Sequence, residues 1–468
     1  MKFNLQFATN QDVEYIHELS LLLLKEVGTV FHSEKALKVF KKHGAKVDGN
    51  VVYLGKNIVE KAIETAPATF SIYGREGDEV NIGGQELIGA QTYGPIHVYC
   101  EGRFENSSHE HYVNFHKLAE TSDIVKISNP MSIDVSFVEK TKRNMYRLGT
   151  TLKYCKKPLY GIVDGGMDAM EKSIDIMQEF YGINNKIISI GLVNTMGPMQ
   201  VSPDMCDALM VYSRRKQALI VTSGGVVGAN VPQSMASSFI MGNAAILAAI
   251  TLTQLINPGT PVVYCGKFAS SDIRHMAPAY GGVESMLGCA TSQRMAEYYR
   301  LPLRSSSSNT ESKVLDYQAG AETFMNILSA YFCKVDLMQH ACGLLDSMNA
   351  IGYEKFILDE EMHLSIRRLI RGYNINEDTA CLDLIREKGP SGRYFGKTTE
   401  LCRTDFFLPK YSIRENYNNW MAAGCPTGET LATKVWKKRL EEYELPELTK
   451  EQKKIIDNLI PKQYQRSY

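Results

Sequence analysis

Short apolar runs rich in β-branched residues alternate with longer amphipathic stretches from about residue 90 to residue 356. Such runs are typical of parallel strands buried on both faces, and the intervening stretches have helical apolar spacing. The predicted strands are Ile96–Tyr99, Ile124–Ile127, Leu159–Val163, Ile187–Val193, Leu219–Val221, Val262–Tyr264, Leu303–Ser305 and Val335–His340. The predicted helices are Ser108–Glu120, Glu139–Tyr154, Asp168–Gly182, Asp204–Arg215, Met235–Ile256, Gly282–Arg300 and Tyr317–Cys333. About eight such units over roughly 250 residues predict an α/β fold, a (βα)8 barrel of the TIM type.

The alternative architecture is an open, doubly wound sheet, which usually has a glycine-rich turn after its first strand. No such turn is found here, so the barrel is preferred. Residues 1–89 are predicted to form a preface of helices and small strands, with the first helix capped near Asn10. Residues 357–468 are predicted to form a helical cap or interface. The chain is therefore divided into residues 1–89, 90–356 and 357–468.

Composition narrows the possible functions. The chain has 52 Lys and Arg against 52 Asp and Glu, whereas a nucleic-acid binder is expected to be basic. Its ten cysteines form no CxxC pair, which is typical of a reducing compartment. No apolar run reaches about 18 residues, and the first residues lack the apolar core of a signal peptide. We therefore expect a cytoplasmic protein that binds neither nucleic acid nor a membrane.

Polar residues follow five of the predicted strands, where they are expected to line the active site of a βα barrel. These positions are Asn194–Pro198, Thr222–Gly225, Tyr264–Lys267, Ser305–Glu311 and His340. The segment from Ser308 to Glu322 adds further polar groups just before a helix, which Asp316 is also suited to cap. We therefore expect the working end of the enzyme to be built largely from Ser305–Phe356.

His340 and Cys342 form a pair that suggests a metal site. A strand directs residues two apart to one face, and imidazole and thiolate groups both bind zinc. No third ligand lies at a diagnostic spacing. The primary prediction is therefore that the chain has no metal site, and a zinc site that includes His340 and Cys342 is kept as an alternative.

Several motifs together resemble the trimethylamine:corrinoid methyltransferase family. They are Ser312-Lys313 with Asp316-x-Gln318-Ala319-Gly320-x-Glu322, Gly259-Thr-Pro261-Val262-Val263-Tyr264, His340-x-x-Gly343-x-Leu345, Tyr353-Glu354-Lys355-Phe356, Asp359-x-Glu361 and Trp420-x-x-x-Gly424. The match extends from about residue 10 to residue 460. The resemblance implies a βα barrel that transfers a methyl group from a methylated amine to the Co(I) of a corrinoid carried by a separate protein.

The resemblance also indicates a branch of this family. Founding members contain pyrrolysine, whereas this chain has only standard residues, so it resembles the non-pyrrolysine branch. That branch demethylates quaternary amines such as glycine betaine, carnitine, γ-butyrobetaine and proline betaine. A quaternary ammonium already carries the charge that makes the amine a leaving group, so the enzyme needs only to position and desolvate it. We therefore predict no acid–base catalytic residue and no tightly bound cofactor, since the Co(I) corrinoid comes with the partner protein.

The expected site binds a cation at one end and a carboxylate at the other. Aromatic faces and nearby carboxylates attract a quaternary ammonium. The candidates are Tyr93, Tyr99, Tyr264, Tyr280 and Tyr353, with Glu311 or Asp316 nearby. Donors for a substrate carboxylate are sought among Asn309, Lys313, His340 and Arg304, with His340 preferred and Met348 in the same wall. The predicted substrate-binding set is Tyr93, Tyr264, Asn309, Glu311, Asp316, His340, Met348 and Tyr353.

The predicted partners are a small quaternary amine, a cognate corrinoid protein and further copies of this chain in a homo-oligomer. Residues 140–157 contain seven lysines and arginines. A solvated helix face is the simpler interpretation of this basic stretch, and docking of the corrinoid protein is the functional alternative. Two alternative functions are kept. One is a zinc-dependent methyltransferase directed at a thiol, which would use His340 and Cys342, and the other is a non-catalytic barrel that binds betaines.

Overall fold

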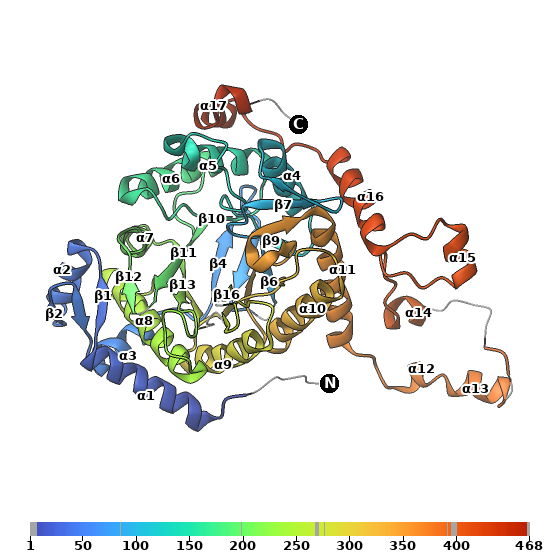
Figure 1. The fold of residues 1–468 in the computed structure, drawn as a ribbon, viewed down its shortest axis with the longest axis horizontal. Coiled ribbons are helices and arrows are strands. Elements are labelled where there is room, and N and C mark those ends of the chain that lie inside the picture. Colours follow the sequence, from blue (N-terminus) through green and yellow to red (C-terminus); the bar gives the residue numbers. More distant parts are fainter. Residues whose placement is uncertain are drawn as a thin grey trace.

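The computed structural model describes residues 7–465 except 85, 198, 267–270, 276, 391 and 395–399. It is an α/β fold in which parallel strands lie at the centre and helices surround them (Figure 1). The central strands are β6 (Ile88–Ala90), β9 (Val125–Ile127), β10 (Leu159–Tyr160), β11 (Ser189–Met196), β13 (Ala218–Gly224), β14 (Val262–Cys265), β17 (Arg304–Ser306) and β18 (Leu337–Gln339). The surrounding helices are α4 (His109–Glu120), α5 (Arg143–Tyr154), α6 (Gly166–Tyr181), α7 (Pro203–Arg214), α8 (Met235–Ile256), α9 (Val283–Tyr299), α10 (Tyr317–Phe332) and α11 (Tyr353–Arg371).

The parallel strands contact one another in the order in which they occur along the chain. One series runs β10-β11-β13-β14 and the other runs β17-β18-β6-β9. Single parallel bridges link the two series, from Ser128 to Leu159 and from Tyr264 to Leu303. Because β18 also pairs with β6, the sequence of contacts returns to its starting strand.

Alternate residues of these strands enter two different apolar cores. Ile220 and Val263 pack in a core on one side of the strands, together with residues of β6, β9, β10, β11 and β18. Leu219, Val221 and Val262 pack in the larger core on the other side, which also contains residues of the helices. Such burial on both faces explains why the strands are continuously apolar in the sequence.

The first predicted strand was assigned wrongly. The segment predicted as Ile96–Tyr99 is β7 (His97–Cys100), which forms an antiparallel hairpin with β8 (Arg103–Asn106) and pairs with β20 (Ala350–Gly352). The first central strand is β6, whose three residues give little apolar signal. Its Gly89 is required because a Cβ there would lie 2.3 Å from the carbonyl oxygen of Ile124. The predicted boundary at residue 90 therefore falls at the end of a central strand.

The N-terminal segment covers one long apolar helix. Its elements are α1 (Asn10–Glu26), β1 (Thr29–Phe31), α2 (Glu34–Lys42), β2 (Lys46–Asp48), β3 (Val51–Tyr53), α3 (Lys56–Thr65), β4 (Phe70–Tyr73) and β5 (Glu79–Ile82). Helix α8 is apolar all round and, among the described residues, is the one helix long and apolar enough to cross a membrane. Helices α1, α2, α3 and α7 pack against it, and 78% of its most apolar window is buried. It is therefore placed as a core helix.

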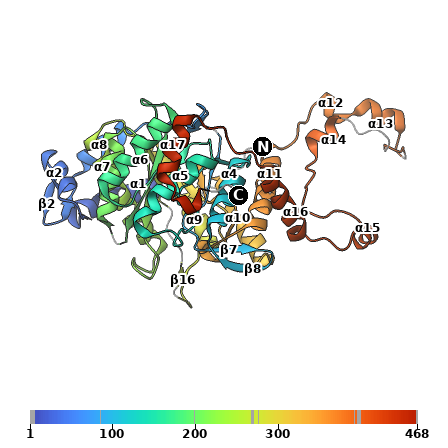
Figure 2. The same cartoon turned by 90° about the horizontal axis from the view of Figure 1, so that it is seen from above.

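The C-terminal segment divides into a packed part and a projecting part. Helices α16 (Gly428–Glu441) and α17 (Lys450–Leu459) pack on α11 and α5, respectively. Between α11 and α16, the chain leaves the body as an arm, which we define as residues 373–426 (Figures 1 and 2). The arm carries the short helices α12 (Glu377–Ala380), α13 (Leu382–Lys388), α14 (Glu400–Asp405) and α15 (Tyr417–Ala422).

Candidate active site

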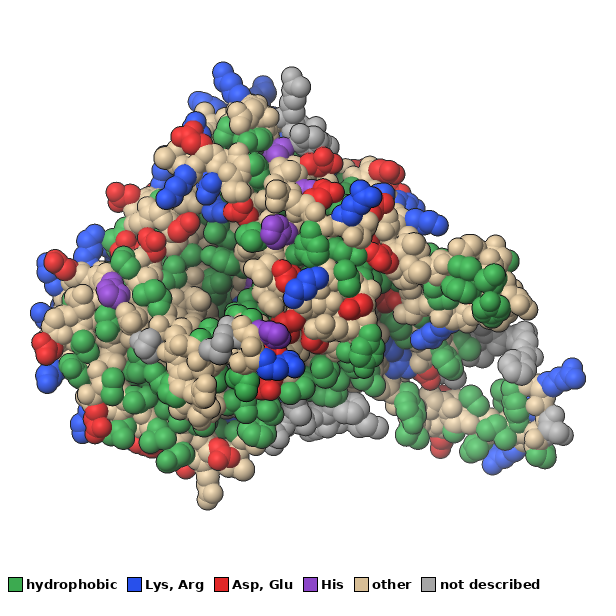
Figure 3. Space-filling model, in the orientation of Figure 1, with side chains coloured by type: hydrophobic (Ala, Val, Ile, Leu, Met, Phe, Trp, Pro, Cys, Tyr) green, Lys and Arg blue, Asp and Glu red, His purple; other side chains and the backbone are tan. Residues whose placement is uncertain are grey.

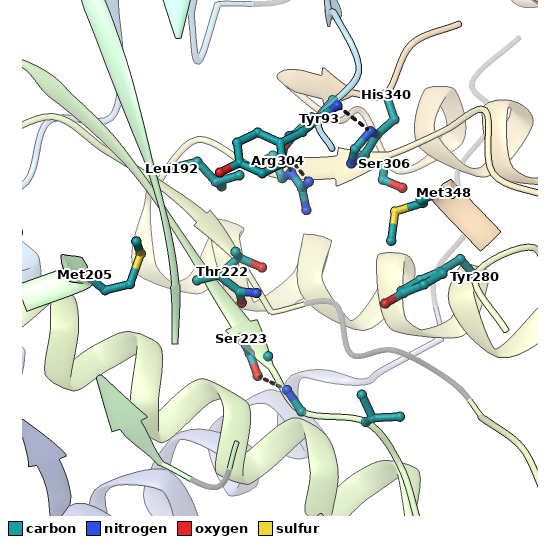
Figure 4. A pocket seen from close by; sticks show the side chains of 15 residues that line it. Tyr93, Leu192, Met205, Thr222, Ser223, Tyr280, Arg304, Ser306, His340 and Met348 are labelled. Carbon is teal, nitrogen blue, oxygen red and sulfur yellow. Dashed lines mark hydrogen bonds between the residues drawn. The ribbon is translucent and has the colours of Figure 1, made fainter. Parts of the chain in front are cut away.

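A cavity of about 370 Å³ lies at the carboxyl ends of the central strands. Active sites of βα barrels occur at this end, because the loops that follow the strands converge there. Its polar wall consists of Asn194, Thr222, Ser223, Arg304, Ser306, Gln339 and His340. The apolar and aromatic wall consists of Tyr93, Leu192, Met205, Val226, Tyr280 and Met348, most of which are labelled in Figure 4.

Arg304 places a buried guanidinium in this wall. It lies on β17 and is only 9% exposed. Its Nε donates to Gln339 Oε1 at 2.9 Å, and its Nη1 lies 3.4 Å from Cys265 Sγ. Every hydrogen bond that the guanidinium makes to the described residues therefore goes to a neutral atom. Because a buried charge is costly without a counter-ion, this position favours an anionic ligand.

His340 enters the cavity from the end of β18 through an unusual backbone conformation. Its φ of +57° lies in the left-handed region, which is rare outside glycine and clusters at functional sites. Its Nδ1 accepts a hydrogen bond from the Tyr93 backbone amide at 3.3 Å. A neutral ring with Nδ1 as acceptor carries its proton on Nε2, so Nε2 is a donor.

Two tyrosine rings and a methionine supply the surface that suits a cation. Tyr93 follows β6, and Tyr280 lies in the loop that leads into α9. Figure 4 shows Tyr280 and Met348 close together, with His340 and Ser306 beside Met348. Burial raises the pKa of Tyr93 and of Tyr280, so both phenols are neutral at physiological pH. Neutral aromatic faces attract a quaternary ammonium without transferring a proton to it.

The turn that carries Met348 is held in a strained conformation. Asp346, Ser347 and Met348 have φ values of +50°, +52° and +73°. Left-handed conformations cost roughly 1–2 kcal/mol per residue, so surrounding contacts must stabilise them. The Asp346 amide donates to the Ser312 carbonyl and the Ser347 amide to the Thr310 carbonyl, each at 2.9 Å. The loop after β17 therefore fixes the position of Met348.

Two of the predicted tyrosines lie in apolar cores instead of the cavity. Tyr264 is fully buried on the helix-facing side of β14, where its hydroxyl donates to Asn243 Oδ1 at 2.8 Å. Successive side chains of a strand point to opposite faces, and those of Val263 and Cys265 point to the interior enclosed by the central strands. The Tyr264 ring therefore points away from that interior. The Tyr353 ring stacks between those of Phe115 and Trp436, with centroids 4.5 and 4.4 Å away. The strand-end position of Tyr264 and the family-like motif that contains Tyr353 therefore did not reveal where these rings point.

Three other predicted residues do not line the cavity. Asn309 donates to Ser306 Oγ and thus lies behind a lining residue. Glu311 accepts from the Gly281 amide at 2.9 Å. Asp316 accepts from the Ala319 amide at 2.9 Å and so caps α10. Of the predicted set, the structure brings Tyr93, His340 and Met348 together at the cavity.

His340 and Cys342 lie in different surroundings. His340 lines the cavity, whereas Cys342 is 1% exposed and packs in the larger apolar core. Burial raises the pKa of the Cys342 thiol well above its usual value, which disfavours the thiolate that binds zinc. The left-handed φ of His340 interrupts the strand, so the expectation that both side chains share one face is wrong. Among the described residues, no group of three or more His, Cys, Asp and Glu side chains is placed to hold a metal.

The basic stretch of residues 140–157 is only partly exposed. Arg147 and Lys153 are both 8% exposed. Lys157 Nζ donates to the carbonyls of Ala119, Ser122 and Val125 at 2.6–2.8 Å. Arg147 and Lys153 are therefore buried and Lys157 is bound by backbone carbonyls, so the stretch does not form a continuous basic face.

The wall also contains residues that the sequence did not single out. Gln339 stands directly before His340 in the sequence, and Leu192 and Met205 come from β11 and α7. Arg304 and Tyr280 were among the candidates but not in the preferred set. The signal that favours Arg304 is a cation at the start of a strand, where a charge is uncommon in a parallel sheet.

Comparison with known proteins identifies the family. A family model described as "Trimethylamine methyltransferase (MTTB)" matches residues 3–467. The chain is 34% identical to a proline betaine:corrinoid methyltransferase of Eubacterium limosum, over 98% of each chain. It is 32% identical to a glycine betaine methyltransferase of Desulfitobacterium hafniense, over 96% of this chain and 95% of that one.

A solved structure shows the same fold at lower identity. The monomethylamine methyltransferase of Methanosarcina barkeri matches with a TM-score of 0.52 and 13% identity, over 95% of this chain and 97% of that one. The match of the family model over nearly the whole chain confirms the resemblance seen in the sequence motifs. The chain therefore belongs to the trimethylamine methyltransferase (MTTB) family.

Proposed function

We propose that this enzyme transfers a methyl group from a small carboxylated quaternary amine to the Co(I) corrinoid of a separate protein. The observation that carries the proposal is the buried guanidinium of Arg304, which faces a cavity with two tyrosine rings. The guanidinium and His340 Nε2 suit a carboxylate, and the tyrosine rings suit a quaternary ammonium. The relatives from Eubacterium limosum and Desulfitobacterium hafniense, named for proline betaine and glycine betaine, support this substrate class.

The side chains of the cavity suit a reaction that needs no proton transfer. The corrinoid supplies the electron pair that forms the new bond to the methyl carbon, and the C–N electrons leave with a neutral tertiary amine. Arg304 and His340 would hold the carboxylate, so that one N-methyl group points toward the opening. Tyr93, Tyr280 and Met348 would exclude water from the ammonium, which lowers the cost of losing its charge.

We infer that the central strands form a closed (βα)8 barrel of the TIM type. The cyclic order of strand contacts supports this, as does the alternation of strand residues between two apolar cores. In such a barrel, the cavity opens on the face where the corrinoid protein must dock to bring its cobalt within reach of the methyl carbon. The ten cysteines form no disulfide in the described part of the chain, which supports a cytoplasmic location.

We further propose that the chain forms a homo-oligomer in which the arm packs against a second copy. Exposed apolar side chains gather on the arm (Figure 3). They include Tyr373, Ile375, Leu382, Ile385, Phe406, Leu408 and Tyr417. Residues 373–426 contain seven basic and seven acidic residues, so charge does not oppose contact with an identical arm. A self-complementary contact of this kind is the commonest route to a homodimer.

The proposed substrate class is tested with free Co(I) cobalamin and a panel of methylated amines. Glycine betaine, proline betaine and carnitine are compared with choline and trimethylamine. Choline lacks the carboxylate, and trimethylamine lacks both the carboxylate and the quaternary ammonium. Methylation of cobalamin is followed by its absorbance. We expect at least one betaine to exceed choline and trimethylamine by about 30-fold or more in kcat/KM, the effect of about 2 kcal/mol for a charge-assisted pair.

Three results of this panel would contradict the proposal. Activity with trimethylamine but with no quaternary amine would show that the substrate class is wrong. Equal activity with choline and betaines would show that Arg304 does not bind a substrate carboxylate. Tight binding of a betaine without methylation of cobalamin would favour a non-catalytic binding protein.

A further inference from the structure

Three consecutive residues, Thr310 to Ser312, hold two separate parts of the cavity wall; we call them the bracket. The carbonyls of Thr310 and Ser312 accept the hydrogen bonds that fix the strained turn before Met348. The side chain of Glu311 points to the loop that carries Tyr280. One short segment therefore determines where both side chains meet the cavity.

The contact between Glu311 and the Tyr280 loop is made through the backbone. The Gly281 amide donates to both carboxylate oxygens of Glu311, at 2.9 and 3.0 Å. The Gly281 carbonyl accepts from Asn326 Nδ2 at 3.4 Å. Both backbone polar groups of Gly281 are thus bound by side chains of neighbouring elements. Because Gly281 directly follows Tyr280, these bonds restrict the direction in which the Tyr280 ring leaves the backbone.

A second carboxylate supports Glu311 from helix α10. Glu322 Oε2 accepts from the Thr310 hydroxyl at 2.6 Å and from the Glu311 amide at 2.9 Å. The two carboxylates share a confined space with Gly281, where a Cβ would lie 2.7 Å from an oxygen of each. A Cβ at position 281 would therefore displace the two carboxylates from their present positions. Burial, with Glu322 nearby, raises the pKa of Glu311, and the Gly281 amide opposes that rise.

We propose that Glu311 is a positioning residue, which holds the Tyr280 loop so that the Tyr280 ring forms the ammonium-binding wall of the cavity. The inference rests on the proposed function, because it assumes that Tyr280 faces a quaternary ammonium. Glu311 acts through the backbone of Gly281 and not by direct contact with the substrate. Glu322 accepts from the Thr310 hydroxyl and the Glu311 amide, and so holds the backbone from which the Glu311 side chain extends.

The alternative role for Glu311 is direct attraction of the cation by its negative charge. Glu311→Gln separates the two roles, because it removes the charge and keeps one oxygen that can accept from the Gly281 amide. Glu311→Ala removes both. Gly281→Ala keeps Glu311 but displaces it through the added Cβ. Glu14→Gln, at an exposed position on α1, is the matched control for loss of a charge.

The experiment measures the dissociation constant of glycine betaine by calorimetry, with proline betaine as a second ligand. Tyr280→Leu removes the ring and is expected to weaken binding by about 3- to 30-fold. Glu311→Ala and Gly281→Ala should weaken binding by a similar factor, whereas Glu311→Gln and Glu14→Gln should stay within about threefold of wild type. In the Tyr280→Leu background, Glu311→Ala should have little further effect, because both changes remove one interaction.

Each contrary result has a distinct meaning. Glu311→Gln could weaken betaine binding as much as Glu311→Ala, with an effect that adds to that of Tyr280→Leu. Glu311 would then act by its charge, and the positioning role would be wrong. If Tyr280→Leu weakens binding and Glu311→Ala does not, the bracket does not position the ring. If Tyr280→Leu leaves the binding of both betaines unchanged, the proposed site itself is wrong. Thermal unfolding of each variant, compared with wild type, separates a local change from loss of the fold.

Discussion

The cavity and the arm differ in the chemical groups that the rest of the described chain does not match. The cavity has a buried positive charge, and the arm has exposed apolar side chains. The cavity buries a guanidinium whose hydrogen bonds go to neutral atoms, beside neutral aromatic rings. The arm exposes apolar side chains, with Ile375 at 86% and Leu408 at 74% exposure. A buried charge is best matched by a small anionic ligand, whereas exposed apolar surface is best matched by protein. This difference supports the proposals that the cavity recognises the substrate and that the arm mediates assembly.

The two regions also differ in how their backbones are fixed. At the cavity, non-glycine residues with left-handed φ angles are held by hydrogen bonds from neighbouring loops. The arm is held mainly at its base, where Glu361 accepts from the amides of Lys410, Tyr411 and Ser412. A pre-organised site loses little entropy when a small ligand binds. A projecting segment with exposed apolar side chains can bury them only against a partner, which is the reason for proposing assembly through the arm.

The largest predicted effect comes from removing the cation of the cavity. Arg304→Ala should weaken glycine betaine binding by about 2–5 kcal/mol, or at least roughly 30-fold, because the carboxylate would lose its charged partner. Arg304→Lys keeps the charge but not the planar fork, so an intermediate loss is expected. Calorimetry with glycine betaine and with choline measures the effect. An equal loss for both ligands would mean that Arg304 shapes the cavity and does not bind the carboxylate.

A smaller effect is expected from placing a charge on the arm. Ile375→Asp and Leu408→Asp should each weaken self-association by about 1.5–3 kcal/mol, the cost of losing one buried apolar side chain. Light scattering at several protein concentrations measures the oligomer, and glycine betaine affinity should stay within about twofold. Tyr15→Asp, on the exposed side of α1, is the control for a charge at an exposed apolar position. Wild-type protein that stays monomeric at micromolar concentration would contradict assembly through the arm.

Periodicity predicted most of the fold because burial on both faces leaves a continuous apolar run at each central strand. Met235–Ile256 was predicted with the observed bounds, and the structure shows Ser234 as its N-cap and Asn257 as its C-cap. Strand β6 was missed because three residues that include a glycine give no such run. The neighbouring segment His97–Cys100 has a stronger β signal but pairs in a peripheral sheet. Strand propensity therefore did not distinguish a central strand from an edge hairpin.

The site was predicted less completely, because residue type does not show which way a side chain points. His340 and Met348 reach the cavity through left-handed backbone angles, which no periodic pattern encodes. Tyr264 has the expected strand position but the opposite face. Glu311 was chosen for its charge, whereas its contacts lie with the backbone of Gly281. These differences depend on packing between segments far apart in the sequence.

The smallest predicted effect concerns Asp316, which lies in the loop between the cavity and the arm. It borders a second hollow beside Phe407 of the arm, and its carboxylate caps α10 through the Ala319 amide. Asp316→Ala should therefore lower stability by about 1 kcal/mol at pH 7 and leave glycine betaine affinity unchanged. Asp316→Asn, which can also cap, should lose little.

The pH dependence of this loss follows from the direction of the pKa shift. Hydrogen bonds from the Ala319 amide and the Ser312 hydroxyl lower the pKa of Asp316 in the folded protein. Its contribution is therefore present above the unfolded-state pKa of about 4 and is lost as the pH falls through the lower folded value. The difference in urea midpoint between wild type and Asp316→Ala should be full at pH 7 and should shrink below about pH 4. A variant that keeps its stability but binds glycine betaine more weakly would assign Asp316 to the substrate, as the sequence alone suggested, and would extend the ligand-binding region toward the arm.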